Sequence, residues 1–122
     1  MAYASTVMSG GVSAQSALAM GGGAATALTA AGTTTTDALA LGTLGAHMIS
    51  TCASGAGVRL YAGVAGDEVV VYNGGANPCL VYPPTGAKFN SLSTNGAFTL
   101  ATNTNALCKC ISATQWLVVL SA

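Results

Sequence analysis

The sequence predicts an all-β protein: a single small antiparallel β-sandwich or barrel of about seven or eight short strands, preceded by an extended N-terminal arm rich in Ala, Gly and Thr. Three observations support this prediction. Short β-branched and aromatic runs recur from residue 43 onward, Gly, Asn and Pro separate them, and residues 1–36 carry no charged side chain. The 122 residues of the chain allow one domain.

Residues 1–42 are expected to form the arm, and residues 43–122 the β-module. Within the arm, residues 24–31 could form a helical turn or two, but the glycines at 21–23 and the threonines at 33–36 oppose a long helix. Most of the arm has too few large apolar side chains to offset the entropy that the chain loses on ordering. We therefore expect the arm to become ordered only against a partner.

Seven segments of the β-module are predicted strands. The clearest has the sequence EVVVY and stops at Asn73-Gly74-Gly75, which favours a turn. The other segments are likewise bounded by Gly, Asn or Pro. The predicted strands are residues 47–53, 57–62, 68–72, 79–82, 97–101, 106–112 and 116–120.

Charged side chains are scarce, although an ordinary soluble domain devotes about a quarter of its residues to them. Because there is no basic patch to neutralise phosphates, we expect no nucleic-acid partner. A surface with so few charges is poorly protected against association, so we expect the chain to live in an assembly. The charged residues are Arg59, Lys88, Lys109, Asp37, Asp67 and Glu68.

No membrane association is expected, despite a hydrophobic content of 52%. Residues 14–32 are the most membrane-like window, but they contain three consecutive glycines and several polar side chains instead of a continuous run of large apolar residues. The N-terminus also lacks the basic start and compact apolar core of a secretory signal.

The cysteines Cys52, Cys79, Cys108 and Cys110 are expected to be reduced and buried as small apolar groups. Cys108 and Cys110 would share one face of a strand with Cα atoms roughly 6.5 to 7 Å apart, at or beyond the usual limit for a disulfide. Two disulfides or a zinc site are the alternatives, but a zinc site needs four suitably spaced ligands.

The sequence offers no catalytic constellation, and we expect no catalytic, cofactor-binding or metal-binding residue and no cofactor. His47 lies in an apolar stretch, which is typical of a packed or surface histidine. Asp67 and Glu68 are adjacent, so in a strand they would point to opposite faces, as a solvated pair that cannot act as general acid and base. The common phosphate-binding, serine-hydrolase and zinc-protease motifs do not occur. We expect a protein that is not an enzyme.

The aromatic side chains fall in or beside predicted strands, and two interpretations are open. They could pack in the core and at subunit interfaces. Alternatively, at least two of Tyr61, Tyr82 and Trp116 could line a shallow groove, with nearby Asn side chains, that binds carbohydrate. The aromatic residues in question are Tyr61, Tyr72, Tyr82, Phe89, Phe98 and Trp116.

Several segments occur in an order that resembles a domain of small virion proteins of tailed bacteriophages, of the head-decoration, head-fibre or fibre-base type. The most specific is VYPPTG at residues 81–86, which NGGAN precedes at residues 73–77. The resemblance covers roughly residues 24–120, with departures at Thr35-Thr36 and at Tyr61. The remaining segments are TAAGTTTTDALAL (29–41), SGAGVRL (54–60) and SATQW (112–116).

The resemblance implies a compact β-module that trimerises on a symmetric capsid surface. We therefore expect a capsid decoration (cement) protein, a homotrimer that binds the major capsid protein of the phage head. It would be located in the virion and assembled in the host cytoplasm, which keeps thiols reduced. The alternative functions are a collar or tail component, or a fibre-associated module that recognises host glycans.

Overall fold

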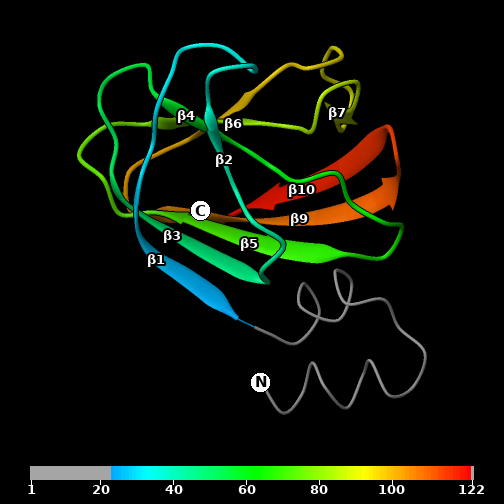
Figure 1. Ribbon diagram of the computed structural model, residues 1–122, viewed down its shortest axis with the longest axis horizontal. Helices are drawn as coiled ribbons and strands as arrows, with labels where there is room; N and C mark the ends of the chain where they lie inside the picture. The colour runs from blue at the N-terminus through cyan, green and yellow to red at the C-terminus, as the bar shows by residue number, and fades with distance from the viewer. Residues whose placement is uncertain (1–22, 122) are drawn as a thin grey trace.

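The computed structural model describes residues 23–121, which form ten strands in two mixed sheets and no helix. Sheet A has six strands in the order β1-β3-β5-β9-β10-β7, and sheet B has four in the order β2-β4-β6-β8. Figure 1 shows the two sheets as two layers. The all-β class that the sequence predicts is confirmed. The strands are β1 (Ala24–Thr29), β2 (Leu39–Ala40), β3 (Ala46–Thr51), β4 (Gly57–Arg59), β5 (Glu68–Asn73), β6 (Cys79–Tyr82), β7 (Lys88–Phe89), β8 (Phe98–Leu100), β9 (Thr104–Ser112) and β10 (Gln115–Leu120).

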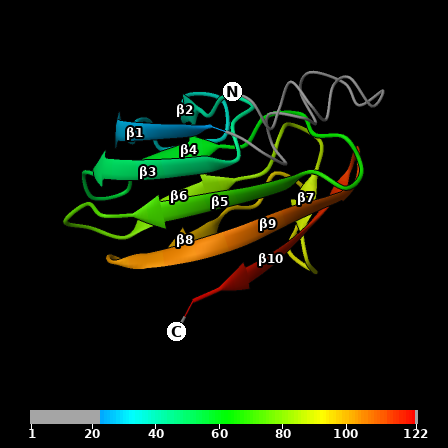
Figure 2. The same cartoon turned by 90° about the horizontal axis from the view of Figure 1, so that it is seen from below.

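The first six strands alternate between the sheets, so that the chain winds through three stacked rungs. Strands β1, β3 and β5 run parallel in sheet A, while β2, β4 and β6 run parallel in sheet B. Figure 2 shows the three strands of sheet A side by side, with those of sheet B behind them. The arrangement is therefore solenoid-like, and the predicted antiparallel sandwich or barrel of seven or eight strands is wrong in its pairing.

Antiparallel strands complete both sheets beyond the third rung. In sheet A, β9 pairs with β5 and β10 pairs with β9, whereas in sheet B β8 pairs with β6. The short strand β7 then lies parallel to β10 at the sheet edge. The C-terminal third of the chain thus closes one end of the rung stack.

The predicted turn at residues 73–75 is confirmed, and it lies at a corner where the chain passes from sheet A to sheet B. Asn73 is buried, and its side-chain amide donates to the carbonyls of Asn77 (2.9 Å) and Leu100 (3.0 Å). Asn77 in turn donates to the carbonyl of Cys52 (2.9 Å), at the corner of the rung before. Asn and Gly favour any sharp change of chain direction, so they cannot distinguish a hairpin from a corner.

The expected helical turn at residues 24–31 is wrong, because Ala24–Thr29 is strand β1. Strand β1 pairs parallel with β3, with a register shift near Ala27, whose φ is 57°. Residues 30–42 continue the first rung, and Ala30 and Leu41 belong to the core. The predicted boundary between arm and β-module at residue 43 therefore separates β1 and β2 from the two sheets to which they belong. The rest of the predicted arm, residues 1–22, lies outside the described residues.

A loop at residues 32–37, called here the threonine loop, folds over the outer side of sheet B. The carboxylate of Asp37 accepts hydrogen bonds from the backbone of Thr33 (3.0 Å) and Thr34 (2.7 Å). Gly32 has a φ of 74°, and a Cβ there would collide with the carbonyl of Asp37. The hydroxyl of Tyr82 in β6 donates to the carbonyl of Thr33 (3.1 Å) and ties the loop to the sheet.

The inner faces of the two sheets meet in one apolar core. Two edge-to-face aromatic pairs lie in it, Tyr61 with Trp116 at 5.9 Å between ring centroids and Phe89 with Phe98 at 4.9 Å. Gly63 packs against the indole, since a Cβ there would lie 2.6 Å from a ring carbon of Trp116. Such pairs add about 0.5 to 1.5 kcal/mol beyond the area that they bury.

A chain that begins at residue 43 should fail to fold. It loses β1, β2 and the apolar side chains of residues 28–41 that pack on the core, worth about 5 kcal/mol, which is comparable with the whole stability of a small domain. Circular dichroism and urea titration would check this against a chain that begins at residue 23, which keeps every described contact. A cooperative transition of equal midpoint in both chains would contradict the assignment of residues 24–42 to the fold.

Candidate functional site

A row of apolar side chains crosses the outer face of sheet A. Register pairing places Ala46 beside Val70, Val70 beside Leu107, and Leu107 beside Val119, so the row passes over β3, β5, β9 and β10. Ala24 of β1 extends it by one more strand. We call these five residues the outer row. Val119 is 69% exposed and Leu107 41%, although each lies in a regular strand with apolar neighbours.

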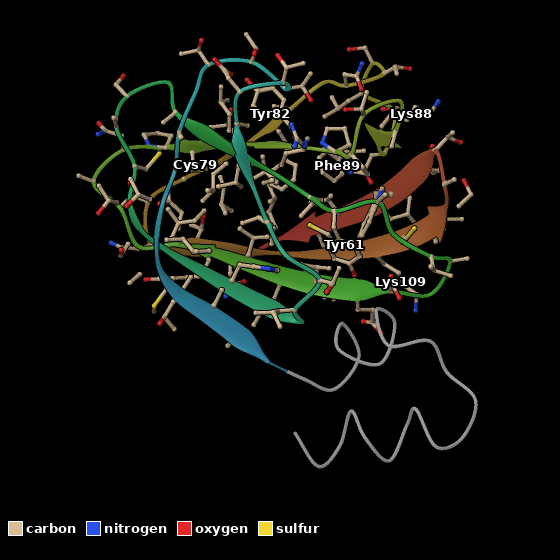
Figure 3. All side chains as sticks on the ribbon, in the orientation of Figure 1. Tyr61, Cys79, Tyr82, Lys88, Phe89 and Lys109 are labelled. Carbon is tan, nitrogen blue, oxygen red and sulfur yellow. The ribbon has the colours of Figure 1, made fainter. Side chains whose placement is uncertain are left out.

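Further exposed apolar side chains flank the outer row. Met48 is paired with Tyr72 on one side of it, and Leu117 with Lys109 on the other. Lys109 forms an ion pair with Glu68 at 3.8 Å between Nζ and Oε1. Figure 3 shows Lys109 on the side of sheet A that faces away from sheet B. An exposed pair of this kind contributes about 0 to 1 kcal/mol, so it interrupts the apolar face without stabilising the fold appreciably.

Asp67 is buried, and the expectation that it is solvated is wrong. Its Oδ2 accepts hydrogen bonds from the Tyr61 hydroxyl (3.2 Å) and from the backbone N–H of Val64 (3.0 Å). Glu68, the next residue, is exposed, so the two carboxylates do face opposite ways. Burial, together with the Asp67 carboxylate, raises the pKa of Tyr61 well above its usual value. The pair fixes the connection between β4 and β5, because the tyrosine stays protonated and keeps donating.

The aromatic side chains do not form the predicted carbohydrate-binding groove. Trp116 is fully buried, and Tyr61 and Tyr82 are less than a tenth exposed. Tyr61 packs edge-on against Trp116 in the core, and Tyr82 lies beneath the threonine loop. Packing in the core is therefore confirmed for Tyr61 and Trp116, and the groove built from two of the three rings is wrong. Packing of aromatic side chains at subunit interfaces stays a prediction.

All four cysteines are free and buried, as the sequence predicts. Cys108 and Cys110 both point from β9 into the core, where burial raises the pKa of Cys108 to about 12. Cys79 and Cys52 lie side by side, and burial together with Cys52 raises the pKa of Cys79 to about 12. A thiol with so high a pKa is a poor nucleophile and a poor metal ligand at neutral pH.

His47 points from β3 into the core and is 2% exposed. Its Nε2 lies 3.2 Å from the carbonyl of Gly42, which fits a neutral ring that donates from this nitrogen. Burial lowers the pKa of His47, and the backbone contacts with Gly42 and Val70 oppose this only in part. His47 is thus a packed histidine and not a surface one, and these were the two interpretations that the sequence left open.

The titratable residues meet in pairs in the described part of the chain, such as Tyr61 with Asp67 and Glu68 with Lys109. Among residues 23–121, no group of three or more His, Cys, Asp or Glu side chains is placed to hold a metal ion. The same part of the chain contains no helix long and apolar enough to cross a membrane.

The sequence analysis did not predict the outer row, although the alternation in β9 contained a signal for it. Because Cys108 and Cys110 lie on one face of the strand, Leu107 and Lys109 lie on the other.

Comparison of the chain with protein-family models, curated proteins and solved structures found no match in any of the three.

The four thiols should resist modification in the folded protein. Because all four are buried, and burial raises the pKa of Cys79, Cys108 and Cys110, we expect 5,5′-dithiobis(2-nitrobenzoate) to react slowly with the native chain and with four equivalents after unfolding in urea. Absorbance of the released thiolate measures both stages. Rapid reaction of any thiol under native conditions would contradict its placement in the core.

The stability of the fold should fall as the pH drops below about 6.5, the ordinary pKa of histidine. The folded-state pKa of His47 is lowered, so the unfolded chain binds the proton more tightly and acid favours unfolding until the pH passes the folded-state pKa. Urea midpoints between pH 7.5 and 5.5 measure the slope. The variant His47→Gln should flatten it, since His47 is the single histidine of the sequence. An unchanged slope in the variant would show that a group other than His47 causes the pH dependence of the urea midpoint.

Proposed function

We propose that the protein is a non-enzymatic structural subunit of a tailed-phage virion, a decoration (cement) protein that binds the major capsid protein of the head as a homotrimer. The observation that carries this proposal is the outer row and the exposed apolar side chains around it. Soluble monomers rarely expose contiguous apolar patches beyond a few hundred Å². A partner surface that covers this face is therefore the simplest account of its composition.

The chemistry of the described side chains favours a structural role over catalysis. The buried acid Asp67 accepts hydrogen bonds from Tyr61 and Val64, and burial raises the pKa of the Cys79 and Cys108 thiols. His47 is enclosed by the core. Reduced thiols also fit assembly in the host cytoplasm, before the particle is released.

A capsid surface suits a subunit with few charges, because repeated weak contacts add up. Each copy can contribute modest apolar and backbone contacts, and three copies joined in a trimer bind a symmetric lattice far more tightly than one. Such binding does not need the long-range steering that a charged surface provides.

A collar or tail location remains the alternative, because a partner would cover the outer row there as well and only the place in the virion would differ. The glycan-recognising alternative loses its support, because the three aromatic side chains on which it depended lie in the core or beneath the threonine loop. Mass spectrometry and cryo-microscopy of purified particles test the proposal. Copies at three-fold positions on the head are expected, and absence from mature virions would overturn it.

Charge placed on the outer row should dissociate the oligomer without unfolding the subunit. We expect Leu107→Glu and Val119→Lys each to raise the trimer dissociation constant at least tenfold, because each buries a charge in an apolar contact. Light scattering over a concentration series measures this, and thermal melting verifies that the fold is kept. Thr99→Lys, an exposed change on sheet B, is the matched control. A wild-type chain that stays monomeric at high concentration would contradict the trimer.

A further inference from the structure

A pocket of about 400 Å³ lies on the outer side of sheet B, far from the outer row. Three segments distant in the sequence meet there: the threonine loop with β2, the end of β4, and the turn after β6. Figure 3 labels Tyr61, which follows β4 and lines the pocket, and Tyr82, the last residue of β6, two residues before the lining residue Pro84. Its principal lining residues are Thr36, Leu41, Arg59, Leu60, Pro84 and Thr85.

Arg59 is the cation of this pocket and is held at one corner. Register pairing places it between Ala40 of β2 and Tyr82 of β6, on the face opposite to the inward Val58. Its Nη1 lies 2.6 Å from the carbonyl of Thr35 and 3.4 Å from that of Thr36, and donates to them. Its Nε and Nη2 have no hydrogen-bond partner among residues 23–121. The described residues thus leave unoccupied the edge of the guanidinium, formed by Nε and Nη2, that best fits a carboxylate.

No acidic side chain of the described chain pairs with Arg59. The one ion pair within residues 23–121 joins Glu68 and Lys109 on sheet A. Asp37 is the acid of the threonine loop, but its Oδ1 accepts from two backbone N–H groups and from the Thr34 hydroxyl at 2.7 Å. Arg59 is therefore a half-buried cation that forms no ion pair within residues 23–121.

The walls of the pocket define what could accompany a carboxylate. Leu41, Leu60 and Pro84 are buried and supply apolar surface, while the exposed residues Thr36 and Thr85 carry hydroxyl groups. The volume exceeds that of a carboxylate alone, so it also accommodates an aliphatic stem. The side chain of glutamate or aspartate on a loop has this composition.

We propose that the pocket binds an acidic side chain of the partner protein to which the subunit attaches. This rests on the proposed function, and names the chemistry of the partner's contact. The formal net charge of the chain is zero, so no long-range field gathers free anions at this single arginine. The carboxylate is instead presented by a surface already bound, and the arginine fork selects its position.

A titration with a small probe tests the pocket in the purified chain alone. The probe is N-acetyl-glutamate methylamide, and its matched neutral control is N-acetyl-glutamine methylamide. We expect the glutamate probe to bind with a millimolar dissociation constant and to shift the backbone amide signals of Ala40, Leu60 and Thr85 in ¹⁵N-resolved spectra. The glutamine control should bind at least tenfold more weakly. Equal binding of the two probes would overturn the proposal.

Two pairs of variants separate the pocket from the fold. Arg59→Gln should abolish binding of the probe, whereas Lys109→Gln, which removes a cation from sheet A, should leave it unchanged. Because Arg59 also holds the threonine loop, Thr85→Glu provides a second test that keeps its hydrogen bonds. The new carboxylate should occupy the guanidinium edge and block the probe at least tenfold, while Thr85→Gln should not. Undiminished binding in Thr85→Glu would overturn the proposal.

The source of the carboxylate and the proposed function are tested separately. Glucuronate, with glucose as its control, probes a sugar acid, and tighter binding of glucuronate than of the glutamate probe would overturn a protein partner. Particles that carry Thr85→Glu subunits should show reduced occupancy with an intact trimer. Absence of the protein from virions would overturn the proposed function, whereas failure of the titration would overturn the pocket alone.

Discussion

Stacking of the inward side chains between rungs is the constraint on which this structure depends. In sheet B, Leu39, Val58 and Val81 occupy one register line, and in sheet A His47 and Val71 continue another. A chain that crosses between the sheets in every rung can bury both inner faces only when successive rungs keep this register. At the corners, backbone carbonyl groups lie outside the strand ladders and need other hydrogen-bond donors. The side-chain amides of Asn73 and Asn77 donate to such carbonyls.

The same constraint bears on why His47 and Asp67 are found inside. His47 follows the inward line of β3, so the core that stabilises the fold also disfavours its protonated form. Asp67 ends the connection from β4, and it is tolerated in the interior because Tyr61 and Val64 donate to it. The outward lines have no such limit. They carry the outer row on sheet A and Arg59 on sheet B, which places the two proposed contact surfaces on opposite sides of the subunit.

The sequence predicted the strands of this fold better than their partners. Each of its seven predicted strands overlaps an observed one, and residues 79–82 agree at both ends. Periodicity and turn residues are local properties, whereas parallel or antiparallel pairing depends on where the chain goes after a turn. Strand β1 was missed because half of its residues are Ala, which favours helices and is depleted in strands, and pairing with β3 decided its conformation. For the sites, the scarcity of charged residues led us to expect association with a partner. No pattern in the neighbouring sequence predicts that Asp67 is buried, or that three distant segments form a pocket at Arg59.

The ion pair beside the outer row also bears on how the chain is made. During synthesis the β5 segment, with three consecutive valines, emerges long before β9, so its free edge has no antiparallel partner while the intervening residues are added. An apolar strand with an open edge readily joins another chain. Glu68 stands at the start of this run, and a charge in that position discourages such pairing. Lys109 of β9 is synthesised later and forms the ion pair with Glu68 in the finished sheet. Glu68 therefore contributes more by disfavouring pairing between nascent chains than by stabilising the mature fold.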